Sequence, residues 1–463
     1  MKAELRANPP TITLVQNPNL FTTPSAAAAT QSRSVSGAAL SGCCLSNLDG
    51  ACIEKLLLHC ASALERNDVT LAQQIMWVLN NVASSAGDPN QRLTSYFLKA
   101  LVSKASRLCP TTTFNSAAAV GGARRLMSVT ELAGYVDLIP WHRFGFCASN
   151  SAILEAIRGF PKVHILDFSI THCMQWPTLI DAVAKRAAED GGGPPLLSLR
   201  ISVLSWRPNV PPFLNASIEE VGQRLTNFAN YRDVPFQFDV VHHHEVTGQD
   251  SNLLLGQLNP STLKLRNDEA LVVNCQNWLR YLPDDEDDDH EEDDIRRSIP
   301  SSYGRDSFLE TIRNLNPCLV TIVDEDCDLG GSNRSLASRI TTCFNYMLIP
   351  FDALETFLPK NSARRLDYEE DIGRKIENVV GFEGARRIER QESSGNLWRR
   401  MAMKNGFTSV PFGEDTVKEV RVLLSEHASG WGMKKDEEMM ILTWKGHNYV
   451  YATAWAPLDR AIT

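Results

Sequence analysis

The sequence lacks any apolar stretch near the roughly 20 residues that a membrane-spanning helix needs. The opening segment MKAELRANPPTITLV also lacks the apolar core of a secretory signal. None of the 11 cysteines forms a C-x-x-C pair, and their number is odd. These absences argue against membrane insertion, secretion and a disulfide framework, and they predict an intracellular protein.

A strongly basic composition is missing as well. The net charge is −9, but it becomes +1 once the ten carboxylates of Asp284–Asp294 (DDEDDDHEEDD) are set aside. The remaining chain is close to neutral, which argues against a protein that depends mainly on phosphate contacts. Like charges at this density repel one another and bury no apolar surface, so we predict a disordered insertion over residues 283–300.

Three further regions differ in their pattern of apolar residues. Residues 1–42 are rich in alanine, serine, threonine, asparagine and proline and show no sustained period, which predicts disorder. Residues 43–160 are predicted to form a helical cap, because helix-start signals such as Asp88-Pro89 recur among amphipathic stretches. Residues 161–463 switch to short apolar runs between helices and are predicted to form an α/β core.

One stretch of the cap carries an apolar residue at every seventh position, at Leu57, Leu64, Leu71 and Val78. This spacing fits a leucine zipper, which needs an unbroken helix. Arg66-Asn67-Asp68 and a capping box from Thr70 to Gln73 interrupt the helix. We therefore predict a helical hairpin here and not a continuous coiled coil.

Strands and helices alternate in the predicted core. Strands are predicted at the short apolar runs Val163–Phe168, Leu197–Val203, Phe236–Val241, Ala270–Asn274 and Leu319–Asp324. Helices are predicted at Pro177–Ala188, Ser217–Asn230 and Ser307–Leu315. This βαβ alternation indicates a parallel sheet covered on both faces. Near the carboxyl end, Glu438–Trp444 and Tyr449–Trp455 predict an antiparallel hairpin added to that sheet.

Several blocks of sequence match the motifs of one family in order. Val163-His-Ile-Leu-Asp167 matches a VHIID motif, with Leu166 for its second isoleucine, and its flanks Ser151–Ala156 and Gln175–Leu179 match too. Residues 51–105 and 214–260 are similar to two leucine-rich regions, and Pro317–Arg390 is similar to a PFYRE region. A SAW motif is matched by Trp431-Gly432, Leu442-Thr-Trp444 and Ala454-Trp455, with Thr453 in the place of its serine. Over about residues 43–457 the chain thus resembles the GRAS family of plant transcriptional regulators, and within it the scarecrow-like 32 branch.

This resemblance implies a fold and a function. The fold is expected to be a Rossmann-type parallel sheet, similar to that of S-adenosylmethionine-dependent methyltransferases, with an N-terminal helical cap. The function is expected to be transcription regulation in the nucleus, as a homo- or heterodimer with other GRAS proteins and together with C2H2 zinc-finger transcription factors. Promoter DNA is expected to be contacted directly or through such partners. A DELLA-type sequence is absent, so a gibberellin-receptor-binding repressor is not expected.

Three functions therefore stay open: a non-enzymatic regulator acting through other proteins, a sequence-specific DNA-binding factor, and a methyltransferase-like enzyme or small-molecule sensor. The near-neutral composition favours the first over the second. A cofactor at the first βα turn needs glycines that expose backbone N–H groups, yet residues 163–187 contain none. The next strand, Leu199–Trp206, lacks the acidic residue that holds a ribose. Asp167 is expected to cap its turn, and we predict no catalytic residue and no cofactor.

Two polar clusters invite a metal-binding interpretation. The run His242-His-His-Glu245 is more consistent with a strand end entering a loop, because neighbouring strand residues point to opposite faces. The run Asp324-Glu-Asp-Cys-Asp328 lies at the carboxyl end of a strand, where it can bind Mg²⁺ or face a basic partner. A solvated loop is the favoured interpretation, so no metal site is predicted.

A group of arginines is the candidate for contact with DNA or a protein partner. Arg386, Arg387 and Arg390 are expected on one helix, followed by Arg399, Arg400 and Lys404. Positions 386 and 390 share a helix face and are able to hold phosphates or an acidic partner. Glutamates interleaved with these arginines favour ion pairs within the chain instead.

Tryptophans gather in the last third of the chain, at Trp398, Trp431, Trp444 and Trp455. Tryptophan is enriched at interface hot spots. Packing within the sheet is nevertheless the favoured role for them, so the VHILD residues and Trp431, Trp444 and Trp455 are predicted to be structural.

Overall fold

The computed structural model of the chain describes residues 50–108, 125–189, 198–205, 207–242, 258–283, 304–330 and 334–460. These residues belong to two compact units. The predicted disordered segment 1–42 and, apart from residue 283, the predicted insertion 283–300 lie outside the described residues. No helix among those described is long and apolar enough to cross a membrane.

The first unit is helical and is assembled from three separate stretches of the chain. It contains α1 (Gly50–Glu65), α2 (Val69–Val82), α3 (Pro89–Leu108), the first part of α10 (Leu336–Phe357) and the last part of α11 (Ala363–Gly381). The ring of Phe97 on α3 meets the ring of Phe344 on α10 edge to face, with 5.5 Å between centroids. Apolar contacts between stretches that are distant in sequence therefore hold this unit together.

α1 and α2 form the predicted helical hairpin. The chain reverses between them at Asn67, whose φ of 60° lies in the left-handed region that asparagine tolerates. The N-cap of α2 is Asp68, whose carboxylate accepts a hydrogen bond from the backbone N–H of Leu71 at 3.0 Å. The predicted capping box at Thr70 is therefore wrong, because the carboxylate satisfies the helix end earlier. The predicted cap at Asp88 is confirmed, since its side chain accepts from the backbone N–H of Gln91 at 2.9 Å.

The second unit is built on a sheet whose nine described strands run β5-β3-β2-β6-β7-β11-β10-β9, with β8 paired to β11. The parallel strands are β2 (Lys162–Asp167), β3 (Ser198–Leu204), β5 (Phe236–Val241), β6 (Ala270–Gln276) and β7 (Leu319–Glu325). The antiparallel strands are β8 (Phe407–Ser409), β9 (Trp431–Asp436), β10 (Met439–Trp444) and β11 (His447–Pro457). The order of the parallel strands confirms the predicted Rossmann-type core, and β10 with β11 confirms the predicted hairpin.

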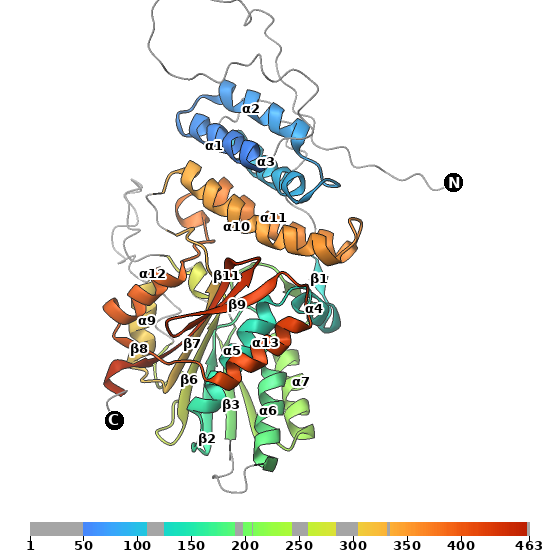
Figure 1. Cartoon of the computed structure of the whole chain (residues 1–463). Coiled ribbons are helices and arrows are strands. Elements are labelled where there is room, and N and C mark those ends of the chain that lie inside the picture. The colour runs from blue at the N-terminus through green and yellow to red at the C-terminus, as the bar shows by residue number, and fades with distance from the viewer. Residues whose placement is uncertain are drawn as a thin grey trace, which may run out of the picture. The chain divides into compact units, whose positions relative to one another are not determined.

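Helices cover both faces of this sheet (Figure 1). One face carries α5 (Trp141–Ala156), α6 (Trp176–Glu189), α7 (Ile218–Tyr231) and α13 (Glu414–Ser425). The other face packs α9 (Arg305–Asn314) and α12 (Ser394–Arg399) into an apolar core that includes Leu166, Val273 and Trp455. The unit also contains α4 (Val129–Val136) and a short parallel pair, β1 (Leu126–Met127) with β4 (Phe213–Leu214).

The two units do not divide at residue 160, where the sequence pattern changes. α5 precedes that residue but belongs to the sheet unit. Its Gly145 lies so close to the sheet that an added Cβ atom would be 2.8 Å from Cγ1 of Val323. Parts of α10 and α11 follow residue 160 but belong to the helical unit. Periodicity identifies a helix but does not say which surface the helix packs on, which is why the boundary differs.

Candidate functional site

The strand order reverses between β2 and β6, which is where open α/β sheets bind ligands at the carboxyl ends of their strands. Asp167 ends β2 and lies opposite Asn274 of β6. The two side chains are 2% and 0% exposed. We call the buried polar side chains at this point the switch-point cluster: Asn150, Asp167, Ser169, Gln175, Asn274 and Thr321.

Four protein donors already occupy the carboxylate of Asp167. One oxygen accepts from the backbone N–H of Ser169 at 2.9 Å and from the amide of Asn274 at 3.0 Å. The other accepts from the hydroxyl of Ser169 at 3.1 Å and from the indole N–H of Trp176 at 2.8 Å. Burial raises the pKa of Asp167, and these donors oppose that shift. The carboxylate therefore holds the turn after β2, as its predicted capping role requires.

The rest of the switch-point cluster is also bonded internally. Asn274 donates to the Gln175 side-chain oxygen at 3.1 Å and accepts from the Thr321 hydroxyl at 2.8 Å. The Gln175 amide in turn donates to the side-chain oxygen of Asn150 on α5 at 2.9 Å. A ligand hydroxyl would reach Asp167 only by displacing one of these protein groups.

The glycine-free turn keeps a backbone shape that glycine usually provides. His172 and Cys173 have φ values of 50° and 63°, both in the left-handed region. Their side chains pack inward, because Cys173 is 1% exposed and His172 Nε2 lies 2.8 Å from the carbonyl oxygen of Pro212. Burial, together with the charge of Arg207, lowers the pKa of His172 to about 4. The turn is thus a packed part of the core and not an open cradle for an anion.

His164 of the VHILD segment belongs to a buried charge network. Arg200 donates to its Nδ1 at 2.9 Å and pairs with the Glu269 carboxylate at 2.5 Å. Since arginine is only a donor, Nδ1 is unprotonated and Nε2 donates to the Ser202 hydroxyl at 2.8 Å. Burial, and next the charge of Arg200, lower the pKa of His164 to about 3. The apolar residues of the segment are fully buried: Val163, Ile165 and Leu166.

The predicted solvated loop over Asp324–Asp328 is wrong for its first half. Asp324 and Glu325 are the last residues of β7 and are only 2% and 1% exposed. Arg280 pairs with both of them, and its guanidinium lies 2.8 Å from the Glu325 carboxylate. Burial raises the pKa of Asp324, while Arg280 lowers it. Because the charges are paired, the carboxylates are able to stay inside the sheet.

Neither polar cluster forms a metal site within the described part of the chain. No group of three or more His, Cys, Asp and Glu side chains there is arranged to hold an ion. β5 ends at Val241 and His242 follows it, as predicted for a strand end. Residues 243–245 of the histidine run lie outside the described residues.

The helix predicted to carry Arg386, Arg387 and Arg390 is wrong. Only a 3-10 turn, Gly384–Arg386, is present, and residues 387–393 are not helical. Arg387 is 3% exposed and donates to the carbonyl of Leu329 at 2.6 Å, while Arg390 is 6% exposed and donates to that of Gly384 at 3.0 Å. Arg390 thus bonds the backbone of its own segment, and Arg387 ties this segment to the chain that follows β7. Arg386 alone of the three is exposed.

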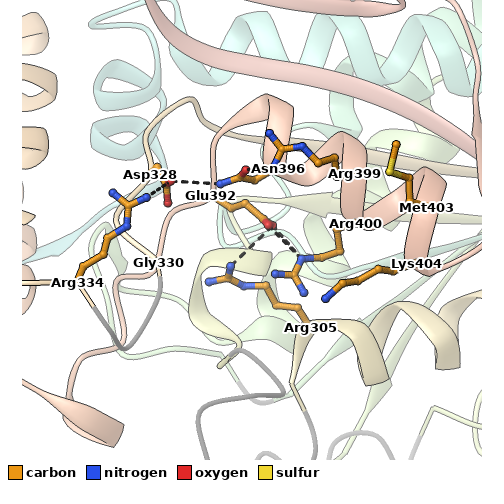
Figure 2. A pocket seen from close by; sticks show the side chains of 10 residues that line it. All are labelled: Arg305, Asp328, Gly330, Arg334, Glu392, Asn396, Arg399, Arg400, Met403 and Lys404. Atoms are coloured by element: carbon orange, nitrogen blue, oxygen red, sulfur yellow. Dashed lines mark hydrogen bonds and ion pairs between the residues drawn. The ribbon is translucent and has the colours of Figure 1, made fainter.

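Arg399 and Arg400 line a pocket of about 450 Å³, which we call the basic pocket (Figure 2). α12 continues there into one π-helical turn, Arg400–Lys404. The cationic lining residues are Arg305, Arg334, Arg399, Arg400 and Lys404. The remaining lining residues are the carboxylates Asp328 and Glu392, with Gly330, Asn396 and Met403. Five cations against two carboxylates leave the lining with a net charge of +3.

Ion pairs organise the walls of the basic pocket. Nε of Arg400 lies 3.1 Å from each carboxylate oxygen of Glu392, and Nη1 of Arg305 lies 3.7 Å from one of them. Arg334 pairs with Asp328. Arg305 is 1% exposed, and it also donates to the carbonyl of Leu279 at 3.1 Å. The ion pairs that the sequence favours for Arg400 are therefore present, but they surround a recess.

Sequence reasoning missed Arg305 and Arg334 as pocket residues. Arg305 begins α9 and Arg334 precedes α10, so neither belongs to the arginine-rich segment 386–400. No local pattern marks either residue. Their convergence with α12 depends on the tertiary fold alone.

The tryptophans of the predicted C-terminal motif are buried in the sheet. Trp431, Trp444 and Trp455 are 9%, 2% and 0% exposed. The rings of Trp431 and Trp444 lie 4.9 Å apart, and the indole N–H of Trp444 donates to the carboxylate of Asp352 at 2.6 Å. Packing within the sheet is thus their observed role.

Comparison with known proteins places these features in a family. The model of the GRAS domain family matches residues 53–456. Scarecrow-like protein 32 of Arabidopsis thaliana is 46% identical over 414 residues, which cover 89% of this chain and 95% of that protein. Protein SHORT-ROOT 1 of Oryza sativa subsp. japonica is 34% identical, over 87% of this chain and 68% of its own length. The crystal structure of SCL7 in Oryza sativa has a TM-score of 0.67 and 25% identity, and the match covers 87% of this chain and 99% of that one.

Proposed function

Because the chain belongs to the GRAS family of plant transcriptional regulators, we propose that it acts in the nucleus as a non-enzymatic regulator that reaches promoters through other proteins. Its partners are other GRAS proteins, in homo- or heterodimers, and transcription factors of the C2H2 zinc-finger type. No catalytic residue, cofactor or metal ion takes part in this function.

The proposal that the protein is not an enzyme is supported by the carboxylate of Asp167, which is bonded to protein donors. A methyltransferase-like enzyme needs an acidic residue and open backbone at this edge of the sheet to hold its cofactor. Here the carboxylate is bound by Ser169, Trp176 and Asn274, and the following turn is filled by the side chains of His172 and Cys173. These contacts stabilise the fold and leave no acceptor for a ribose.

The action through partners is supported by charge and burial. Outside the acidic run the chain is nearly neutral, since setting aside its ten carboxylates changes the net charge from −9 to +1. Two of the five arginines considered for DNA contact, Arg387 and Arg390, point into the core. Direct sequence-specific DNA binding remains the alternative, and of the five arginines considered for it Arg386 and Arg399 are exposed.

A gel-shift experiment with the full chain tests the two functions. The probe is a promoter fragment that a purified C2H2 zinc-finger protein binds, at about 150 mM salt. We expect the chain alone to leave the probe unshifted and to retard the zinc-finger–DNA complex further. A shift by the chain alone that weakens steeply with salt would establish direct DNA binding and overturn action through partners.

Calorimetry with S-adenosylmethionine tests the absence of a cofactor. We expect no binding at micromolar concentrations of the full chain. Micromolar binding that Asp167→Ala abolishes would contradict the non-enzymatic function. Sedimentation equilibrium of the same preparation measures dimerisation, and a fluorescent fusion in plant cells measures nuclear location.

A further inference from the structure

The basic pocket brings five cationic side chains around a recess. We propose that this pocket binds a phosphomonoester, and that the phosphate belongs to a phosphorylated serine or threonine of a protein partner. The proposal deepens the proposed function and rests on it only for the source of the phosphate.

The guanidinium groups at the base of the pocket already converge on an anion of this chain. Glu392 receives Arg400 through both of its oxygens at 3.1 Å, and Arg305 approaches the same carboxylate to 3.7 Å. Figure 2 shows Lys404 extending toward the same region. Nη1 of Arg400 also lies 2.8 Å from the Asp306 carboxylate. Guanidinium groups that bind carboxylate oxygens also bind phosphate oxygens, so the walls present the chemistry that an oxyanion needs.

The mouth of the pocket carries positive charge that is open to a ligand. Arg399 is exposed and donates to the side-chain oxygen of Asn396 at 2.9 Å, and no carboxylate pairs with it among the described residues. The side chain of Lys404 is 58% exposed and lies 3.5 Å from the Asp306 carboxylate. Arg399 and Lys404 therefore add positive charge at the pocket beside the pair between Arg400 and Glu392.

The depth of the pocket favours a monoester over the diester of a nucleic acid. Arg305 is 1% exposed, so only a group that projects inward approaches it. A phosphorylated side chain projects in this way and carries nearly two charges, whereas a duplex phosphate carries one charge and is flanked by sugars on both sides.

The size and rim of the pocket favour a peptide as the carrier. A volume of about 450 Å³ exceeds a lone phosphate and leaves room for neighbouring atoms. Met403 lines the pocket and is 71% exposed, which gives the rim an apolar contact beside the cations. Flexible methionines suit peptide surfaces of varied shape.

The test measures binding of a fluorescent peptide, Gly-Gly-phosphoserine-Gly-Gly, to the full chain by anisotropy. The double variant Arg399→Gln/Lys404→Gln removes both exposed cations of the pocket and should weaken binding by about tenfold, because the charge that attracts the phosphate is lowered by two. Arg421→Gln/Lys434→Gln is the matched control, since it removes one exposed arginine and one exposed lysine from α13 and β9 of the same unit. Control binding should stay within about twofold of the parent. All four positions are exposed, and thermal melting checks that each variant is folded.

Competitors identify the chemistry and its source. We expect the unphosphorylated peptide to compete poorly and the phosphopeptide to bind more tightly than inorganic phosphate. Equal weakening in the pocket and control variants would overturn the proposal, because only overall charge would then matter. If a DNA duplex at the same phosphate concentration displaced the peptide, the preference for a monoester would be contradicted. If inorganic phosphate bound with equal affinity, the proposal that the phosphate belongs to a protein partner would be contradicted. The assay contains neither zinc-finger protein nor promoter, so its failure is distinct from a failure of the gel-shift experiment.

Discussion

Asn274 of β6 donates a hydrogen bond to the carboxylate of Asp167 of β2 over 3.0 Å, across the point where the strand order reverses. In a cofactor-binding α/β protein, side chains at this point face the ligand. Here the two side chains bond to each other. Protein side chains therefore fill the position that a ligand takes in a cofactor-binding α/β protein.

Replacing Asp167 by alanine should lower the free energy of unfolding by about 2 to 4 kcal/mol, because buried donors from Ser169, Trp176 and Asn274 lose their acceptor. Urea denaturation measures the change. Asp268→Ala is the matched control, since Asp268 is exposed and pairs with Lys162 at the surface, and it should leave stability nearly unchanged. Equal effects of the two variants would show that the switch-point cluster does not hold the fold.

The stability of the protein should fall with acid in a manner that depends on His164. Its pKa is about 3 in the folded chain and near 6.5 when unperturbed, so the unfolded chain binds a proton between these values that the folded chain does not. The contribution of neutral His164 to the free energy of unfolding is fully present above pH 6.5 and is lost as the pH falls toward 3. The free energy of unfolding then changes by up to about 1.4 kcal/mol per pH unit. Urea titrations from pH 7 to pH 5 should give a shallower slope for His164→Asn. The exposed-site variant His447→Asn should keep the slope of the parent, and a parental slope in His164→Asn would contradict the assignment.

Asp68→Ala should destabilise the protein by about 1 kcal/mol, because α2 loses its N-cap. Thr70→Ala is the control, since Thr70 lies inside α2 and alanine favours a helix. Thermal melting compares the two variants. If α1 and α2 were one continuous zipper helix, Asp68→Ala would instead be neutral or stabilising.

Deleting Asp284–Asp294, which lies outside the described residues, should shift the melting temperature by only a few degrees, because loop length contributes little to the cost of closure. The deletion should also raise nonspecific affinity for DNA, since it removes ten carboxylates that compete with phosphates for basic surface. Calorimetric melting and a salt series of DNA-binding measurements check the two effects. An unfolded variant would show that the acidic run is structural. An unchanged affinity for DNA would show that the run does not compete with phosphates for basic surface.

The sequence predicts the sheet well, because strands such as Val163–Phe168 and Phe236–Val241 are local apolar runs that need no distant information. The capping role of Asp167 is also predictable, because the sequence shows that the turn after it lacks the glycines that a cofactor site needs. What the sequence does not reveal depends on distant partners. Asp324 is predicted at a strand end that opens into a solvated loop, but it is buried because Arg280, 44 residues away, pairs with it.

The basic pocket also depends on residues that are distant in sequence, so the sequence alone does not predict it. The arginine-rich segment is conspicuous in sequence, yet only Arg399 and Arg400 of its five candidate arginines line the pocket. Arg387 and Arg390 are buried by contacts with backbone carbonyls, which no periodicity predicts. Arg305 reaches the pocket from another helix altogether.

The helical unit has a consequence for how the gene can change. Its helices come from residues 50–108, 335–351 and 372–382, so two of its three pieces are encoded downstream of most sheet strands. A recombination event that transfers only the first stretch carries α1 to α3 without the ring of Phe344 that packs on Phe97. An N-terminal cassette of α1 to α3 would therefore leave the apolar surface of α3 without its partner from α10.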